Sequence, residues 1–290
     1  MHLHLFSIIL SDVQSPKGYI LLTRPVNLSI AFLSIFMGGA VTGTIQPLAK
    51  LLLACLSGTL IAAGANAVND FFDIDIDRIN KPMRPLPSGM VGPKQAHALS
   101  LCCFALGIGI SAFIHIPGLV IAVLSSFLLY FYSYRLKRTV VWGNVTVALV
   151  SGMAFVYGGL AVGRIRQAAV VGIFSFLFHW AREMIKDAED VEGDRAAGIR
   201  TLPIAYGIRV TLVWAAAVMA VLTAATLVPY WMGWFGKAYL VTVVLGVDCF
   251  LACVGVSMFR RPEPKHLGKL AVLMKADMLV GLLAVFLGNR

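Results

Sequence analysis

Long apolar runs constrain the fold of this chain more than any other feature of its sequence. Hydrophobic residues occupy 59% of the 290 positions, charged residues occupy 13%, and the mean hydropathy is +0.85. Soluble domains carry about 25% charged residues, so this composition excludes an ordinary soluble domain. A run of about 20 apolar residues is long enough to cross a bilayer. We therefore predict a multi-pass integral membrane protein.

Nine such runs follow one another along the chain. Backbone groups in lipid must hydrogen-bond within their own segment, and the two-residue alternation of barrel strands is missing, so each run is predicted to be a helix. The nine predicted spans are residues 19–44, 49–71, 96–114, 118–134, 141–162, 168–185, 210–231, 238–259 and 270–287. The predicted fold class is an all-α membrane bundle of nine transmembrane helices forming one domain, residues 1–290.

The basic residues predict how the bundle is oriented. With the N-terminus inside, cytoplasmic segments hold 18 of the 24 lysines and arginines, the outer side holds 5, and Lys275 lies within a span. Cytoplasmic loops are enriched in Lys and Arg, so we expect a cell-membrane protein with its N-terminus in the cytoplasm and its C-terminus outside. The net charge of +10 then reflects topology and attraction to anionic membrane lipid or substrate. Nucleic acid is not an expected partner, because the basic residues lie in short loops.

The acidic residues gather in two matched segments, at the ends of predicted helices 2 and 6. At 100° per residue, the polar side chains of the first segment fall at about 0°, 40°, 340° and 20° around one helix, whereas Asp75 falls at about 180°. These four residues are Asn66, Asp70, Asp73 and Asp77. The same spacing returns 117 residues later in Glu183, Asp187, Asp190 and Asp194.

Carboxylates stacked on one helix face repel each other, and at a helix C-terminus they also oppose the macrodipole. A bound divalent cation would remove this conflict. A solvated acidic face could explain either segment alone, but the two segments hold 10 of the 14 acidic residues of a very apolar chain. We therefore predict that they form two halves of one metal site. Its predicted ligands are Asp70, Asp73, Asp77, Asp187, Asp190 and Asp194.

Several basic and polar residues follow these segments closely. The loop after the first one carries three prolines, which end the helix, and three cations. We expect contact between these loops and a phosphorylated substrate, with anchoring of the membrane topology as the alternative role. The predicted contacts are Arg78, Lys81, Arg84, Tyr132, Lys137 and Arg200. Within the last two spans, Asp248 and Lys275 are expected to pair, and a structural or functional role for them and for Asp277 is left open.

The run NDFFDIDIDRINKPMRPLPSG resembles the N-D-x-x-D-x-x-x-D motif of the UbiA superfamily of intramembrane prenyltransferases, and DAEDVEGDRAAGIRTLP resembles its D-x-x-x-D motif. The resemblance covers essentially the whole chain. It places Asn69, Asp70, Asp73 and Asp77 in the first motif and Asp190 and Asp194 in the second. It implies an isoprenyl diphosphate substrate held through Mg²⁺. It further implies catalytic roles for Asp70, Asp73, Asp77, Asp190 and Asp194, and substrate binding by Asn66, Asn69 and the cations named above.

The sequence constrains the acceptor molecule less than it constrains the fold, the metal site or the diphosphate substrate. The second segment resembles the K-D-x-E-D-V-E-G-D pattern of the ether-lipid branch, the digeranylgeranylglyceryl phosphate synthases. The implied reaction is transfer of a geranylgeranyl group to the hydroxyl of geranylgeranylglyceryl phosphate, with Arg24 as a candidate phosphate contact. An aromatic quinone precursor or chlorophyllide is the alternative acceptor. A magnesium channel or transporter is the alternative outside enzymes, although it would carry its acidic residues along a pore.

Overall fold

The chain is built entirely from helices in the part that the structure describes. The computed structural model describes residues 15–288, except the side chains of residues 79 and 80, so the ends of the predicted 1–290 domain lie outside it. The N-terminal half comprises α2 (Pro16–Thr23), α3 (Pro25–Ala40), α4 (Leu48–Phe72), α5 (Ile74–Asn80), α6 (Pro93–Ser111), α7 (Ile116–Tyr134), η1 (Leu136–Arg138) and α8 (Trp142–Ala161). The C-terminal half comprises α9 (Arg166–Glu189), α10 (Val191–Ala196), α11 (Leu202–Tyr206), α12 (Ile208–Trp231), α13 (Lys237–Thr242), η2 (Val243–Asp248), α14 (Cys249–Arg260) and α15 (Pro264–Gly288).

The predicted count of nine spans is not confirmed. Among residues 15–288, seven helices are long and apolar enough to cross a membrane, or eight if the bent pair α2 and α3 forms one span. Helix α6 corresponds to the expected span 96–114 but does not qualify. Its first turns contain Pro93, Lys94, Gln95 and His97, which lower the mean hydropathy of a helix only 19 residues long. The coarser prediction, an all-helical multi-pass bundle, agrees with the structure.

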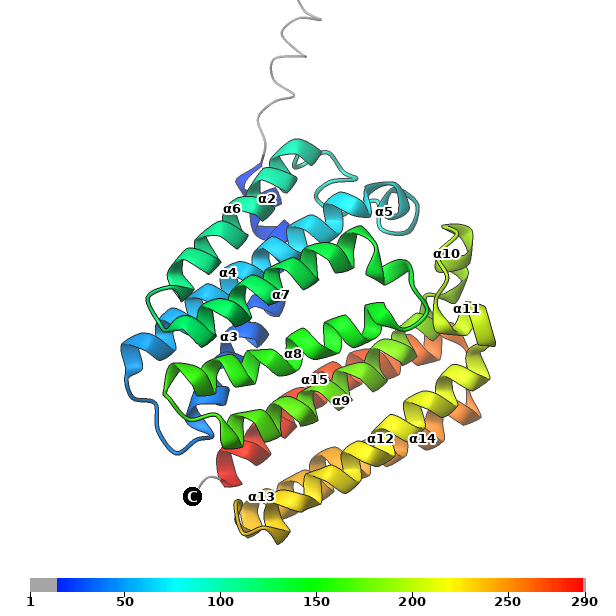
Figure 1. Ribbon diagram of the computed structural model, residues 1–290. Helices are drawn as coiled ribbons and strands as arrows, with labels where there is room; N and C mark the ends of the chain where they lie inside the picture. The colour runs from blue at the N-terminus through cyan, green and yellow to red at the C-terminus, as the bar shows by residue number, and fades with distance from the viewer. Residues whose placement is uncertain (1–14, 289–290) are drawn as a thin grey trace, which may run out of the picture.

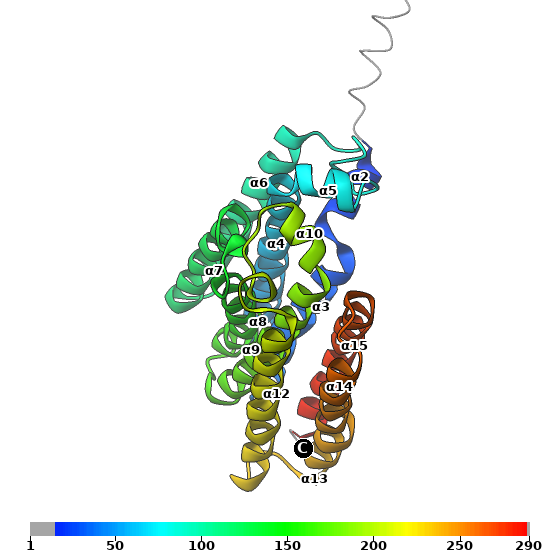
Figure 2. The same cartoon turned by 90° about the vertical axis from the view of Figure 1, so that its right-hand side faces the viewer.

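The long helices pack side by side, and the two acidic segments lie at the same end of the bundle. Helix α4 packs against α6, and α9 packs against both α8 and α12. Figure 1 shows the short helices α5 and α10 as neighbours at this end, while the C-terminus lies at the opposite end. Figure 2 shows the same proximity of α5 and α10 from the side. The fold therefore brings together two sequence segments that are 117 residues apart.

Helices α3 and α8 approach closely because glycines face each other across their interface. A Cβ added to Gly158 would lie 1.8 Å from the Ile35 carbonyl oxygen, and one added to Gly38 would lie 2.1 Å from the Phe155 carbonyl oxygen. Both obstacles are backbone atoms, which cannot rotate away. Small residues permit such close contacts between membrane helices.

We expect Gly158→Ala to lower stability by about 1–3 kcal/mol, because the added methyl group forces α3 and α8 apart. The midpoint of thermal unfolding in detergent would measure the loss. Gly109→Ala is the matched control, since Gly109 is also helical and an added Cβ there meets nothing within 4 Å. An equal loss in both variants would contradict the packing argument.

The expected pairing of Asp248 with Lys275 is wrong. Asp248 accepts hydrogen bonds of 3.2 and 3.1 Å from the Thr226 hydroxyl. Lys275 instead donates a 2.8 Å hydrogen bond to the side-chain oxygen of Asn27 on α3. Membrane-buried polar groups are satisfied by whichever neighbour the bundle supplies, and sequence spacing between two helices does not identify that neighbour.

Candidate active site

Both acidic segments bend at equivalent residues. Helix α4 ends at Phe72 and α5 begins at Ile74, so Asp73 lies at the break with φ −97° and ψ 2°. Asp190 occupies the same position between α9 and α10, with φ −84° and ψ 4°. The prediction that one continuous helix carries each acidic face is therefore wrong. Stacked carboxylates oppose the dipole at a helix C-terminus, which is consistent with a break at this point.

A third break brings a cation to the first acidic segment. Proline disfavours helical backbone in the residue before it, and Arg24, which precedes Pro25, has φ 55°. Helices α2 and α3 consequently meet at 45°. The bend directs the Arg24 guanidinium to Asp70 on α4, with which it forms an ion pair. The predicted contact residue Arg24 thus belongs to the site, although its partner in the structure is a carboxylate.

Basic side chains neutralise every aspartate of the first motif. The Arg84 guanidinium lies 2.5 Å from an Asp77 oxygen and 3.4 Å from an Asp70 oxygen. The Lys137 ammonium pairs with Asp73, whose other oxygen accepts a 2.9 Å hydrogen bond from Asn69. Burial, reinforced by Arg138, lowers the pKa of Lys137 to about 8. Arg84 comes from the loop after α5 and Lys137 comes from η1, so this loop and η1 both fold back over the acidic end of the bundle.

The second motif is held differently. Glu183 pairs with Arg182 at 2.7 Å and with Lys186 at 3.9 Å. Asp187 accepts a 2.8 Å hydrogen bond from Asn144 on α8. Burial, reinforced by the charge of Asp190, raises the pKa of Asp194 to about 6. Unlike the first motif, the second therefore has carboxylates with no ion-pair partner among the described residues, namely Asp187, Asp190 and Asp194.

A cavity of about 850 Å³ opens between the two motifs. Most residues predicted for the site line it: Arg24, Asn66, Asn69, Asp73, Asp77, Lys81, Arg84, Tyr132, Lys137, Asp187, Asp190 and Asp194. Its polar end lies at the acidic segments, and apolar side chains such as Ile61, Leu129 and Val150 form part of its other walls. The cavity therefore has the shape and polarity to hold an amphiphile with an anionic head and a hydrocarbon tail.

Three predicted residues do not line this cavity. Asp70 lies behind its wall, 2% exposed, where it holds Arg24 and Arg84. Arg78 is exposed and pairs at 2.9 Å with Asp75, the aspartate predicted to point away. Arg200 is also exposed and lies outside the cavity. The structure thus places Asp70 as a support for the cations, and it brings neither Arg78 nor Arg200 to the site.

Sequence reasoning did not assign several polar residues of the cavity to the substrate site. Arg182 and Lys186 on α9, Asn27 on α3 and Lys275 on α15 all line it. Two signals could have found them. Cations inside a predicted span usually face the bundle interior. Asn27 also lies one turn after Arg24, and therefore on the same helix face.

The donor set fits a hard divalent cation. Mg²⁺ prefers carboxylate and other oxygen ligands, and the cavity offers carboxylates from both motifs. Among residues 15–288 no three His, Cys, Asp or Glu side chains already converge on one point. The cations paired with the first motif would therefore have to release their carboxylates, whereas Asp187, Asp190 and Asp194 are available. Residues that would hold the ion are Asp73, Asp77, Asp187, Asp190 and Asp194.

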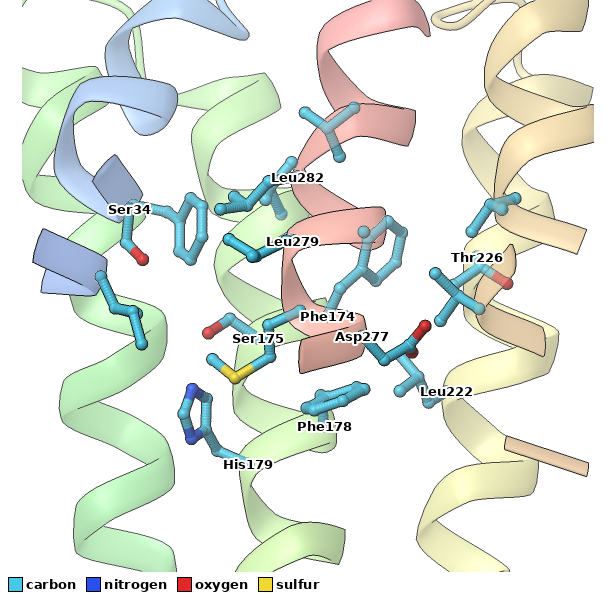
Figure 3. Close-up of a pocket in the computed structure, with 18 of the residues that line it drawn as sticks. Ser34, Phe174, Ser175, Phe178, His179, Leu222, Thr226, Asp277, Leu279 and Leu282 are labelled. Carbon is cyan, nitrogen blue, oxygen red and sulfur yellow. The ribbon is translucent and has the colours of Figure 1, made fainter. Parts of the chain in front are cut away.

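A smaller cavity of about 90 Å³ adjoins the large one between α3, α9, α12 and α15. Figure 3 shows its lining, in which Phe174, Phe178 and Leu279 surround the space and Asp277 points toward Thr226. His179 and Lys275 line both cavities. The polar end of the site therefore has a second apolar extension besides the walls of the main cavity.

Comparison with known proteins identifies relatives of matching length. The chain is 40% identical over 270 residues to a digeranylgeranylglyceryl phosphate synthase of Methanopyrus kandleri. This alignment covers 92% of this chain and 97% of that protein. It is 42% identical to the synthase of that name from Methanoculleus marisnigri, with 84% and 88% covered.

Solved structures show the same fold. A structure described as digeranylgeranylglyceryl phosphate synthase in membranes is similar with a TM-score of 0.80 and 32% identity, covering 94% of this chain and 98% of that one. A UbiA homologue from Archaeoglobus fulgidus, solved with DMAPP and Mg²⁺, shares the fold with a TM-score of 0.71 at 21% identity and covers 91% and 99%. The family model described as the UbiA prenyltransferase family matches residues 28–279. This chain therefore belongs to the UbiA prenyltransferase family.

Proposed function

We propose that this prenyltransferase moves a geranylgeranyl group from its diphosphate to the free hydroxyl of geranylgeranylglyceryl phosphate, in a Mg²⁺-dependent step of ether lipid synthesis. The observation that carries the proposal is that residues of both acidic motifs line the same large cavity. Its polar end presents carboxylates and cations together, and its apolar walls extend between the helices. This combination suits a diphosphate attached to a long hydrocarbon.

In the proposed reaction, the bond between the allylic carbon and the diphosphate oxygen breaks and the diphosphate leaves with the electron pair. Arg84, Lys81 and Lys137 would neutralise the charge that grows on the leaving group, which lowers the barrier. Mg²⁺, when bound, would add to this neutralisation. The acceptor oxygen then forms the ether bond, and its proton passes to a diphosphate oxygen or to a carboxylate of the motifs. Loss of the diphosphate leaves an allylic carbocation, and the apolar walls of the cavity keep water away from it.

The relatives and the second motif support the ether-lipid acceptor. The residues from Lys186 to Asp194 read KDAEDVEGD, the pattern that the sequence resemblance associated with this branch. Both synthases compared above take their name from digeranylgeranylglyceryl phosphate, and both align over more than four-fifths of this chain. An enzyme with an aromatic or tetrapyrrole acceptor would need the same diphosphate half of the cavity, and its cavity would differ in the half that binds the acceptor.

We also propose that α6 crosses the membrane with the other long helices, which gives nine crossings. The N-terminus and the acidic end would then lie in the cytoplasm and the C-terminus outside. The asymmetric distribution of lysine and arginine supports this orientation. Cysteine labelling of Ser88, in the loop after α5, by a membrane-impermeant reagent would test it. Labelling in intact cells would contradict the proposal.

An acceptor panel tests the function directly. Purified enzyme with geranylgeranyl diphosphate and Mg²⁺ should convert geranylgeranylglyceryl phosphate to a diether and release diphosphate, and EDTA should abolish the product. Product with 4-hydroxybenzoate, dihydroxynaphthoate or chlorophyllide, and none with geranylgeranylglyceryl phosphate, would refute the acceptor. Flux of Mg²⁺ through liposomes without prenyl transfer would favour the channel alternative.

A further inference from the structure

Lys275 is a partly buried cation that lines the large cavity, well inside helix α15. It lies in the twelfth position of α15, about 16 Å along the helix from Pro264. Its ammonium group donates to the neutral side chain of Asn27, 2.8 Å away. No carboxylate lies within ion-pair distance of it among the described side chains. Lys275 is only partly exposed, and charged groups inside a membrane bundle usually pair with an opposite charge, so this position favours an anion.

The surroundings of Lys275 strengthen this requirement. Arg182 and Arg24 lie close enough to act on its charge. Arg182 donates a 3.1 Å hydrogen bond to the carbonyl of Ala271, one turn before Lys275 on α15. Glu183 on α9, next to Arg182 in the chain, already pairs with Arg182 and Lys186. Three cations therefore gather where α3, α9 and α15 meet, with two carboxylates, Asp70 and Glu183, among their partners.

Other cations that line the cavity differ from Lys275. Arg84 and Lys137 form ion pairs with the first motif. Lys81 has no ion pair among the described side chains, but the charges of Asp77 and Asp190 act on it. Those three residues belong to the diphosphate half of the proposed site. Lys275 faces the other side, where the large cavity meets the small apolar cavity of Figure 3.

From this arrangement we infer that Lys275, with Asn27 and Arg24 beside it, binds the phosphate of the acceptor lipid. The inference rests on the proposed function and assigns the acceptor's phosphate to a subsite separate from the diphosphate. A phosphate at Lys275 would supply the missing negative charge. The hydrocarbon chain of the same molecule could then enter the apolar space beside Phe174 and Leu279.

The test compares acceptors with and without the phosphate. Wild-type enzyme should prefer geranylgeranylglyceryl phosphate over unphosphorylated geranylgeranylglycerol, and Lys275→Gln should reduce this preference at least about tenfold through a higher KM for the phosphorylated acceptor. The KM for geranylgeranyl diphosphate and the Mg²⁺ concentration for half-maximal rate should stay within about twofold. Lys275→Arg, which keeps the charge, should restore the preference to within about threefold.

Two further variants keep this test decisive. Lys269→Gln is the matched control, because Lys269 lies on the exposed side of the same helix and should keep wild-type constants. Asn27→Asp leaves Lys275 in place but gives it a carboxylate partner, which should also raise the KM for the phosphorylated acceptor. An unchanged phosphate preference in Lys275→Gln, or an equal rise in the KM of the donor, would overturn the inference while the proposed function stands. Failure of wild-type enzyme to use any phosphorylated acceptor would refute the function itself, and the inference with it.

Discussion

Replacing Asp77 with asparagine should reduce turnover at least about 1,000-fold, a loss of about 4 kcal/mol of transition-state stabilisation. Asp77 is 4% exposed, lines the large cavity and lies 2.5 Å from Arg84. The amide keeps the shape of the side chain but cannot neutralise Arg84 or ligate Mg²⁺ as an anion. Initial rates with saturating geranylgeranyl diphosphate, measured over a Mg²⁺ titration, would show the effect.

Asp75→Asn is the matched control for this variant. Asp75 is two residues away on the same short helix, but its side chain is 85% exposed and pairs with Arg78 at the surface. Activity within about twofold of wild type is expected. Comparable losses in the two variants would contradict the assignment of one aspartate to the site and the other to the surface. Equal thermal unfolding midpoints would show that both variants are folded.

The fold class was predictable because lipid leaves a chain few options. An apolar run of about 20 residues must be helical in a bilayer, so helix positions followed from hydropathy alone. The position of α6 was predicted too, but the helix is not apolar enough to qualify as a span, because its first turns carry Lys94, Gln95 and His97. Sequence also paired the acidic segments correctly, because equal spacing on two helices that run in the same direction brings both to one end of the bundle.

Details of the site depended on tertiary contacts that spacing does not encode. The breaks at Asp73 and Asp190 interrupt the two acidic faces, so a helical wheel could not show that Asp70 lies behind the cavity wall. The wheel did separate Asp75 from the other aspartates, and in the structure Asp75 is exposed and does not line the cavity. The partner of Lys275 comes from α3, 248 residues earlier, and no local pattern relates two such positions. The sequence therefore predicted that the two acidic segments meet, whereas it did not predict which side chains pair.

The arginines of the α5 region illustrate the same limit. Arg78 and Arg84 are six residues apart and both were expected to contact the substrate. In the structure Arg84 is 25% exposed and reaches Asp70 and Asp77, whereas Arg78 is 61% exposed and reaches Asp75. Pro82 lies between them, in the turn that follows α5. Proximity in sequence to an acidic motif thus does not determine which cation enters the site.

Arg84→Met should lower kcat/KM for geranylgeranyl diphosphate about 100-fold, or about 2.7 kcal/mol. Arg84 is the one described side chain that bridges two aspartates of the first motif, and methionine retains its length without its charge. The variant loses a cation for the leaving diphosphate and leaves Asp77 without its ion-pair partner. Arg84→Lys should recover part of the loss, because a lysine supplies charge but not the planar fork that joins two carboxylates.

Arg78→Met provides the comparison that decides between the two arginines. It removes an identical charge six residues away, yet the structure predicts activity within about twofold of wild type. A 100-fold loss there, with Arg84→Met nearly unaffected, would mean that the loop between α5 and α6 rearranges when the diphosphate binds. Because both variants change the net charge equally, a difference between them cannot come from general attraction of an anionic substrate. It must come from the position that each guanidinium occupies relative to the aspartates.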